Sequence, residues 1–158
     1  MKLNSVPLTM GSVMLISAAL FDQVTKAVIV ENASSLVYGY PVFPGFNLVF
    51  HRNEGVTFGL LNNLPWWSLS ALAIAVCCWI ALMLVRTSSR AEALAYGAII
   101  GGAIGNIIDR IRFRGVTDFL DFYVGSQHWP AFNMADVFVV CGVVLLIAAP
   151  RLSQNAHA

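Results

Sequence analysis

Charged residues are scarce in this sequence. Lysine, arginine, aspartate and glutamate make up 11% of the 158 residues, whereas hydrophobic residues make up 58%, well above the roughly 45–50% of soluble domains. The formal net charge is only +1, which argues against a nucleic-acid partner, because such partners call for a basic surface. The composition predicts an integral membrane protein surrounded by membrane lipid.

Motifs for metal binding and for covalent catalysis are also missing. The three cysteines, Cys77, Cys78 and Cys141, lie in long apolar runs, and no histidine has a metal-like spacing with them. The sequence contains no G-x-S-x-G, H-E-x-x-H or G-x-x-x-x-G-K motif. We therefore expect buried, unreactive thiols, no metal and no cofactor.

Apolar stretches long enough to cross a membrane occur four times. A bilayer core about 30 Å thick requires roughly 20 helical residues. The four stretches are 6–30, 64–85, 91–110 and 131–150. The first could be mistaken for a cleavable signal peptide because Lys2 precedes it, but it continues past Asp22 and Lys26. Four spans predict that both chain ends lie on the same side of the membrane.

The segments between the spans differ in character. In 31–63, aromatic residues alternate with turn formers, which is typical of short strands and hairpins, so we expect a small interfacial sheet there. The segment 111–130 is expected to be a charged loop. Every acidic residue except Glu92 falls on the side of these two segments. The basic loop 86–90 lacks such acids and is the better candidate for the cytoplasmic side.

Helix packing is predicted by a row of glycines in the third span. Gly97, Gly101 and Gly105 are each four residues apart, so they share one helix face. This G-x-x-x-G spacing favours close approach of another helix in a membrane.

Two predicted spans carry the same pair of polar residues. Asn106 precedes Asp109 by three positions, as Asn133 precedes Asp136, so each pair shares a helix face. An asparagine can donate to a neighbouring carboxylate and fix its orientation. The spacing favours positioned, functional acids over the alternative, a set of interfacial ion pairs that cap short helices.

Some of the acids have an obvious basic partner nearby. Lys26 lies one helical turn after Asp22, and Arg110 directly follows Asp109. We expect both acids to form structural ion pairs. Among the remaining cations, Arg112 and Arg114 are expected to lie near lipid headgroups.

Asp136, in contrast, has no lysine or arginine within fourteen positions. Asp118 and Asp121, which both follow Gly115, compete to be its partner, and the residues alone leave this choice open. Two carboxylates brought close together share one proton, so that one acts as base and the other as acid toward a water molecule. This is the arrangement of an aspartic hydrolase.

Five motifs occur in the order typical of one family. They are "DQVTK" at 22–26, "RNEGVTFG" at 52–59, "GGAIGNIIDR" at 101–110, "GVTDFLDF" at 115–122 and "FNMAD" at 132–136. Through them, nearly the whole chain resembles lipoprotein signal peptidase, or signal peptidase II, the bacterial membrane aspartic peptidase. The resemblance implies one peptidase domain over 1–158, an all-α membrane protein with four transmembrane helices, a small periplasmic β-sheet and a mobile periplasmic loop around 53–59.

The resemblance also implies which residues form the site. It assigns the catalytic pair to Asp118 and Asp136, and so decides against Asp121. The other motif residues are expected to support the site or to bind substrate: Asp22, Lys26, Asn53, Gly55, Asn106, Asp109, Arg110 and Asn133. No metal or other cofactor is implied.

The implied substrate is a prolipoprotein that carries diacylglycerol on the cysteine after its signal peptide, and cleavage occurs just before that cysteine. The implied location is the bacterial cytoplasmic (inner) membrane, with both termini cytoplasmic, the active site toward the periplasm and no obligate protein partner. A small proton-coupled carrier and a purely structural partner protein are the alternatives. A carrier fits less well because the acids gather at one membrane face, and a structural role leaves Asp136 unexplained.

Overall fold

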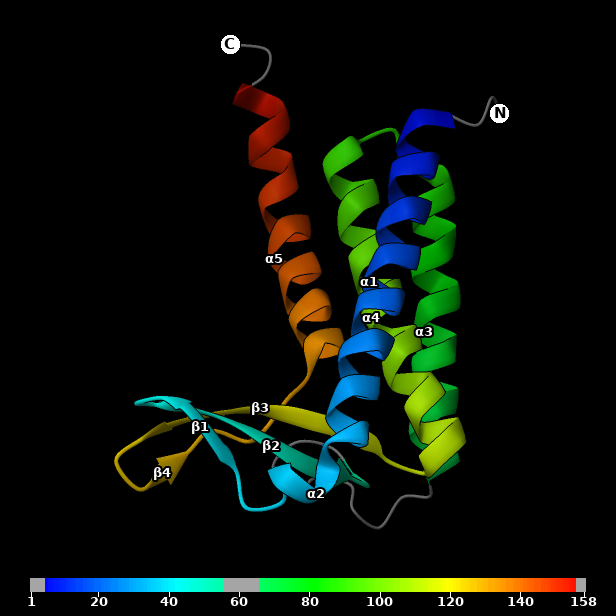
Figure 1. Ribbon diagram of the computed structural model, residues 1–158. Helices are drawn as coiled ribbons and strands as arrows, with labels where there is room; N and C mark the ends of the chain where they lie inside the picture. Colours follow the sequence, from blue (N-terminus) through cyan, green and yellow to red (C-terminus); the bar gives the residue numbers. More distant parts are fainter. Residues whose placement is uncertain (1–4, 56–65, 156–158) are drawn as a thin grey trace.

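Four long helices stand on a small β-sheet in the computed structural model, which describes residues 5–55 and 66–155 (Figure 1). The helices are α1 (Ser5–Glu31), α3 (Trp66–Arg86), α4 (Arg90–Phe113) and α5 (Met134–Asn155), and a short α2 (Ala33–Leu36) follows α1. Helix α1 begins and α5 ends at the same end of the bundle, and the sheet lies at the opposite end. The predicted mobile loop 53–59 falls outside the described residues from position 56 onward.

Three of the predicted spans are confirmed in length and composition. Helices α1, α3 and α4 are long and apolar enough to cross a membrane, whereas the apolar part of α5, Met134–Ala149, is shorter. The fourth span remains a prediction. Helix α4 is the central one, because 56% of its apolar window is buried, against 22% in α1 and in α3.

The glycines of α4 bring α1 against it, as their spacing predicts. A Cβ atom added to Gly97 would lie 2.2 Å from the carbonyl oxygen of Gly11, and one added to Gly101 would lie 2.5 Å from that of Leu15. Neither contact leaves room for a methyl group. The two helix backbones therefore touch directly, as in small-residue packing in membranes.

The prediction of buried cysteines is wrong. Cys78 and Cys141 are exposed, and Cys77 is only partly buried. A membrane helix is apolar on all sides, because its outer face meets lipid and its inner face meets protein. A long apolar run therefore does not indicate which of its residues lie inside.

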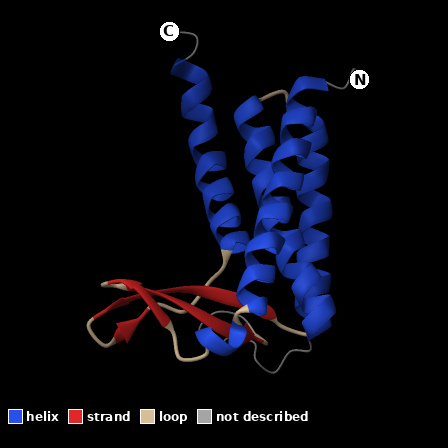
Figure 2. Ribbon diagram, in the orientation of Figure 1, coloured by secondary structure: helices blue, strands red, loops and turns tan. Residues whose placement is uncertain are grey.

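The sheet contains more of the chain than expected. Its strands are β1 (Tyr40–Phe43), β2 (Phe46–Asn53), β3 (Val116–Val124) and β4 (Gln127–His128), paired antiparallel in that order (Figure 2). The predicted strands within 31–63 are confirmed. The segment 111–130, expected to be a loop, instead supplies β3 and β4. Its charges hid a run that is rich in the β-branched and aromatic residues typical of strands.

The turn from α4 into β3 sets the position of the charged segment. The helix ends at Phe113, and Arg114 takes a left-handed backbone conformation with φ of 59°. The left-handed residue is thus Arg114 and not the glycine that follows it. Gly115 is needed for space, because a Cβ atom there would lie 3.0 Å from the carbonyl oxygen of Asn53 on the neighbouring strand.

Candidate active site

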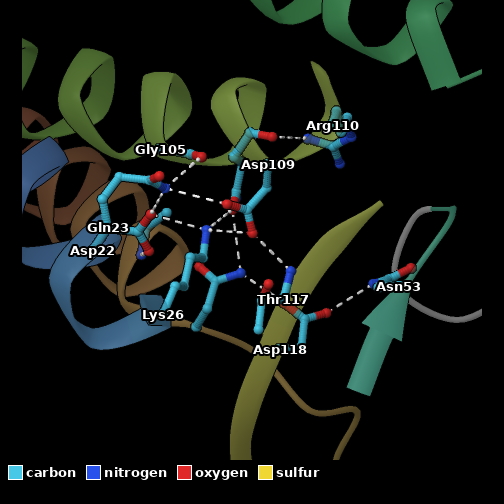
Figure 3. Close-up of polar contacts among 12 residues, drawn as sticks. Asp22, Gln23, Lys26, Asn53, Gly105, Asp109, Arg110, Thr117 and Asp118 are labelled. Carbon is cyan, nitrogen blue, oxygen red and sulfur yellow. Dashed lines mark hydrogen bonds and ion pairs between the residues drawn. The ribbon is translucent and has the colours of Figure 1, made fainter. Parts of the chain in front are cut away.

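Most of the acids and amides singled out from the sequence meet where α1, α4, α5 and β3 come together (Figure 3). Burial is nearly complete here: Asp22, Asp109 and Asn133 are at most 1% exposed, and Asp118 is 2% exposed. Buried carboxylates require partners for their charge and their lone pairs. The contacts of each acid therefore define what the site can do.

Asp118, on β3, is held by two side-chain amides. Asn53 Nδ2 donates to Asp118 Oδ2 at 2.9 Å, and Asn133 Nδ2 donates to Asp118 Oδ1 at 2.6 Å. Gly55 N–H donates to Asn53 Oδ1 at 3.1 Å, which turns the amide group of Asn53 toward the carboxylate. Both oxygens of Asp118 thus accept from neutral donors.

Asp136 lies in the first turn of α5 and forms a capping box with Asn133. Asp136 N–H donates to Asn133 Oδ1 at 3.1 Å, and Asn133 N–H donates to Asp136 Oδ2 at 3.2 Å. The other oxygen, Oδ1, accepts from Asn106 Nδ2 on α4 at 2.9 Å. The start of α5 thereby fixes the carboxylate relative to α4.

The expected donation from the side-chain amide of each Asn-x-x-Asp motif to its own aspartate is wrong, although the backbone N–H of Asn133 does donate to Asp136. The amide group of Asn106 donates to Asp136 rather than to Asp109, and that of Asn133 donates to Asp118 and to Asn106 Oδ1 rather than to Asp136. Each amide therefore serves an acid on another element. Three-residue spacing puts two side chains on the same face of a helix, but that face also meets partners from elsewhere in the chain.

Lys26 lies at the centre of a second, adjoining cluster. Its Nζ contacts Asp22 Oδ2 at 2.9 Å, Asn106 Oδ1 at 2.8 Å and Asp109 Oδ2 at 3.5 Å. The predicted pair of Asp22 with Lys26 is confirmed. The predicted pair of Asp109 with Arg110 is wrong, since Asp109 forms its ion pair with Lys26.

Asp22 and Asp109 also bind backbone N–H groups of other elements. Asp109 Oδ2 accepts from Thr117 N–H at 2.8 Å, which ties the end of α4 to β3. Asp22 Oδ1 accepts from Ala135 N–H at 2.8 Å, which ties α1 to the start of α5. These acids hold in place the two elements that carry Asp118 and Asp136.

Comparison with known proteins identifies the family. The family described as signal peptidase (SPase) II matches residues 14–150. The lipoprotein signal peptidase of Oleidesulfovibrio alaskensis is 43% identical over 134 residues, which cover 81% of this chain and 85% of that protein. The chain belongs to the signal peptidase II family. It is therefore a multi-pass membrane aspartic peptidase, and its family removes signal peptides from lipoproteins.

Other comparisons agree with this family. The lipoprotein signal peptidase of Nitratidesulfovibrio vulgaris is 46% identical over 138 residues, covering 82% of each chain. A solved bacterial membrane enzyme has the same fold, with a TM-score of 0.78 and 26% identity over 93% of this chain and 90% of that chain. The arrangement of helices and sheet is thus one that a signal peptidase II family member shares with an experimentally solved membrane enzyme.

The electrostatics of the site single out Asp118. Burial raises the pKa of Asp118 from 3.8 to about 6, and the nearby charge of Asp136 adds to this rise. The hydrogen bonds from Asn53 and Asn133 and the charge of Lys26 oppose it. Arg110, whose guanidinium group donates to Asn106 O at 3.5 Å, is attracted by the charges of Asp136, Asp118 and Asp109.

A groove with mostly apolar walls opens beside Asp136. It has a volume of about 490 Å³ and runs from Trp129 and Phe132 along α5 to Val140. A groove of this size can bury an apolar ligand segment. Within residues 5–55 and 66–155, no three His, Cys, Asp or Glu side chains are grouped as metal ligands.

Sequence reasoning missed three residues around the site. Gln23 Nε2 lies 3.2 Å from Asp22 Oδ2, Gly105 O and Asp109 Oδ1, and its only sequence signal is its place inside the motif 22–26. Thr117 and Arg52 belong to the edge of the site, where Arg52 donates to Thr117 Oγ1 at 2.7 Å. No spacing rule links them, because the contact depends on the register between β2 and β3.

Asp121 lies in the sheet instead of in the charged loop expected for 111–130. It lies on β3, is 6% exposed, accepts from Asn47 Nδ2 at 2.9 Å and lies 2.8 Å from His128 Nδ1. Its partners come from the sheet alone, and none of them contacts Asp118 or Asp136 among the interactions of the described residues.

Proposed function

We propose that Asp118 and Asp136 are the catalytic dyad of this signal peptidase II family member. One observation carries the proposal: both carboxylates are bonded to the same residue, Asn133. Its side-chain amide donates to Asp118 at 2.6 Å, and its backbone N–H donates to Asp136 at 3.2 Å. A single asparagine therefore holds an acid of β3 next to an acid of α5.

The pair can hydrolyse a peptide bond with one shared proton. We assign this proton to Asp118, because burial and the charge of Asp136 raise its pKa to about 6. Asp136 takes a proton from water as the water oxygen attacks the scissile carbonyl carbon, and Asp118 gives its proton to the carbonyl oxygen. When the tetrahedral intermediate collapses, the C–N bond breaks, the leaving nitrogen takes the proton from Asp136, and one hydroxyl of the intermediate returns its proton to Asp118 as the carbonyl group forms again.

The surrounding residues orient the two carboxylates for this reaction. Asn53, oriented by Gly55, holds Asp118, while Asn106 holds Asp136. Arg110 interacts electrostatically with the carboxylates of Asp136 and Asp118. It can therefore stabilise the negative charge that develops on the substrate carbonyl oxygen. Asp22, Lys26 and Asp109 support the helix ends that carry the site.

The proposed substrate is a prolipoprotein whose cysteine bears diacylglycerol, cleaved just before that cysteine. The apolar groove beside Asp136 supports this choice, since it leads along α5 in the direction that a membrane-anchored peptide would take. A lipid-anchored substrate also keeps its scissile bond close to the membrane surface. The dyad is formed by β3 and the first turn of α5, at the sheet end of the helices, which is the level expected for such a bond.

The proposed topology has four spans in the bacterial inner membrane, with α5 as the fourth, and one peptidase domain over 1–158. Both termini are cytoplasmic and the site faces the periplasm. This is supported by the common end at which α1 begins and α5 ends (Figure 1) and by Arg86 and Arg90 in the loop at that end. Cysteine accessibility from either side of sealed vesicles tests the orientation.

The test of function is a cleavage assay with purified protein in detergent. It compares a diacylglyceryl-modified prolipoprotein with the same chain lacking the lipid. We expect cleavage of the modified chain before its cysteine, no cleavage of the unmodified chain, and loss of cleavage in Asp118→Asn and Asp136→Asn. Equal cleavage of both chains would contradict the proposed substrate, and activity in both variants would contradict the dyad.

A further inference from the structure

The start of α5 is held by a residue of α1. The first N–H groups of any helix lack partners within the helix. In α5, Asn133 and Asp136 satisfy two such groups through their capping box, but Ala135 N–H bonds to Asp22 Oδ1 at 2.8 Å. Asp22 is 113 positions away in sequence. One carboxylate of α1 therefore caps the helix that carries Asp136, through the residue directly before it.

A glycine on α4 makes room for this contact. A Cβ atom on Gly105 would lie 2.3 Å from Asp22 Oδ2, so any larger residue would displace the carboxylate. Away from this point, α5 diverges from α1 (Figure 1). The edge-on contact of Phe21 with Phe138, at 6.1 Å between ring centroids, lies close to the same end. The cap is thus a main polar link between α1 and α5.

We infer that Asp22 is a positioning residue for the reaction, and that its contribution is the bond to Ala135 rather than the charge it presents to Lys26. The inference rests on the proposed dyad. By holding the first turn of α5, Asp22 fixes the distance of the Asp136 carboxylate from Asp118. Displacement of a reacting group by about 1 Å is enough to lower a rate about 100-fold.

The two roles of Asp22 can be separated by substitution. Lys26 retains Asp109 and Asn106 as acceptors when the charge of residue 22 is removed. An asparagine at position 22 still has an oxygen that can accept from Ala135 N–H, whereas an alanine has none. When that oxygen faces Ala135 N–H, the new amide nitrogen faces Lys26 Nζ and Gln23 Nε2, which are both donors. Asp22→Asn therefore keeps the cap but removes the charge and the acceptor for these two donors, and Asp22→Ala removes the cap as well.

The experiment measures kcat and KM for the lipidated prolipoprotein. We expect Asp22→Ala to lower kcat about 100-fold with KM within about twofold, and Asp22→Asn to restore kcat to within about fivefold of wild type. If Asp22→Asn lost as much kcat as Asp22→Ala, the charge would be what matters and the inference would be wrong. Full kcat in Asp22→Ala would also overturn it.

A second test displaces the Asp22 carboxylate without changing residue 22, and it includes a matched control. Gly105→Ala pushes on Asp22, whereas Gly101→Ala produces a similar clash between α4 and α1 at Leu15, away from Asp22. We expect Gly105→Ala to lose at least tenfold more kcat than Gly101→Ala at comparable melting temperatures. Equal losses would assign the effect to helix packing and contradict the inference.

Hydrogen exchange at the Ala135 amide reports on the cap without catalysis. We expect faster exchange in Asp22→Ala than in wild type and Asp22→Asn. Unchanged exchange in Asp22→Ala, together with normal cleavage by wild type, would overturn the inference alone. If wild type failed to cleave the lipidated chain, the proposed function would be wrong, and the exchange result would still decide whether Asp22 caps α5.

Discussion

Strand β3 carries two aspartates, Asp118 and Asp121, that differ in surroundings and not in burial. Asp118 and Asp121 are 2% and 6% exposed, and both accept an asparagine amide at 2.9 Å. Asp118, the nearer of the two to the helices, has a second amide donor and the like charge of Asp136 nearby. Asp121 instead has His128 beside it, a side chain that is 52% exposed.

This comparison shows why burial alone does not make an acid reactive. A neighbouring carboxylate favours retention of a proton, and only Asp118 has one, Asp136, among the causes that raise its pKa. Asp118 therefore suits proton exchange with a water molecule. Asp121 suits a structural bond that holds β4 and β2 to β3.

The largest difference should appear when each acid near the helices is made neutral. Asp118→Asn and Asp136→Asn should each lower the cleavage rate by about 10³–10⁴-fold, because each removes one member of the proton-sharing pair. Both variants should remain folded, which melting curves in detergent would check. Turnover above a few per cent of wild type in either variant would contradict the dyad.

The pH dependence of stability should also depend on Asp118. Its pKa is about 6 in the folded protein against an ordinary 3.8, so below pH 4 it is protonated in both states. As the pH rises from about 4 toward 6, Asp118 ionises in the unfolded chain before it ionises in the folded protein. This difference lowers the free energy of unfolding by up to about 3 kcal/mol. Wild type should therefore lose stability over this range relative to Asp118→Asn.

Melting temperatures of both proteins, measured between pH 4 and 7.5, test this sign. The difference between variant and wild type should shift in favour of the variant as the pH rises. A difference that stays constant with pH would mean that Asp118 has an ordinary pKa in the folded protein.

The two asparagines that bind the aspartates provide a matched pair. Asn53→Ala should lower kcat about 10–100-fold, because Asp118 becomes ionised when it gives up its proton, and a hydrogen bond donated to the ionised form contributes about 1.5–3 kcal/mol. Asn47→Ala, which removes the equivalent bond to Asp121, should leave kcat within about threefold. Measurements of kcat compare the two variants, and similar losses in both would remove the functional distinction between Asp118 and Asp121.

The smallest effect is expected for Asp121→Asn. The variant keeps an oxygen that can face Asn47 but loses the charge beside His128, so we expect a melting temperature about 2–4 °C lower, from about 1 kcal/mol. Activity should stay within about threefold of wild type. A loss of activity equal to that of Asp118→Asn would show that the choice between the two acids is wrong.

Composition and spacing by themselves determined the membrane character, three of the helices and the glycine packing face of α4. These features depend on residues close together in sequence, because a lipid surrounding and a helical repeat act on every turn. The motifs determined the family. They also indicated Asp118 and Asp136 as the reacting acids, an assignment that stays a prediction for the experiments above.

Only the tertiary structure decided which polar side chains bond to one another. The sequence placed Asn133 near Asp136 and Arg110 beside Asp109, yet the side-chain amide of Asn133 donates to Asp118, and Lys26 binds Asp109. The charges in 111–130 led to the prediction of a loop where strand β3 lies. The apolar runs led to the prediction of buried cysteines, two of which are exposed. The reason is physical: a side chain extends away from its own backbone, so its partners are set by the packing of elements distant in sequence.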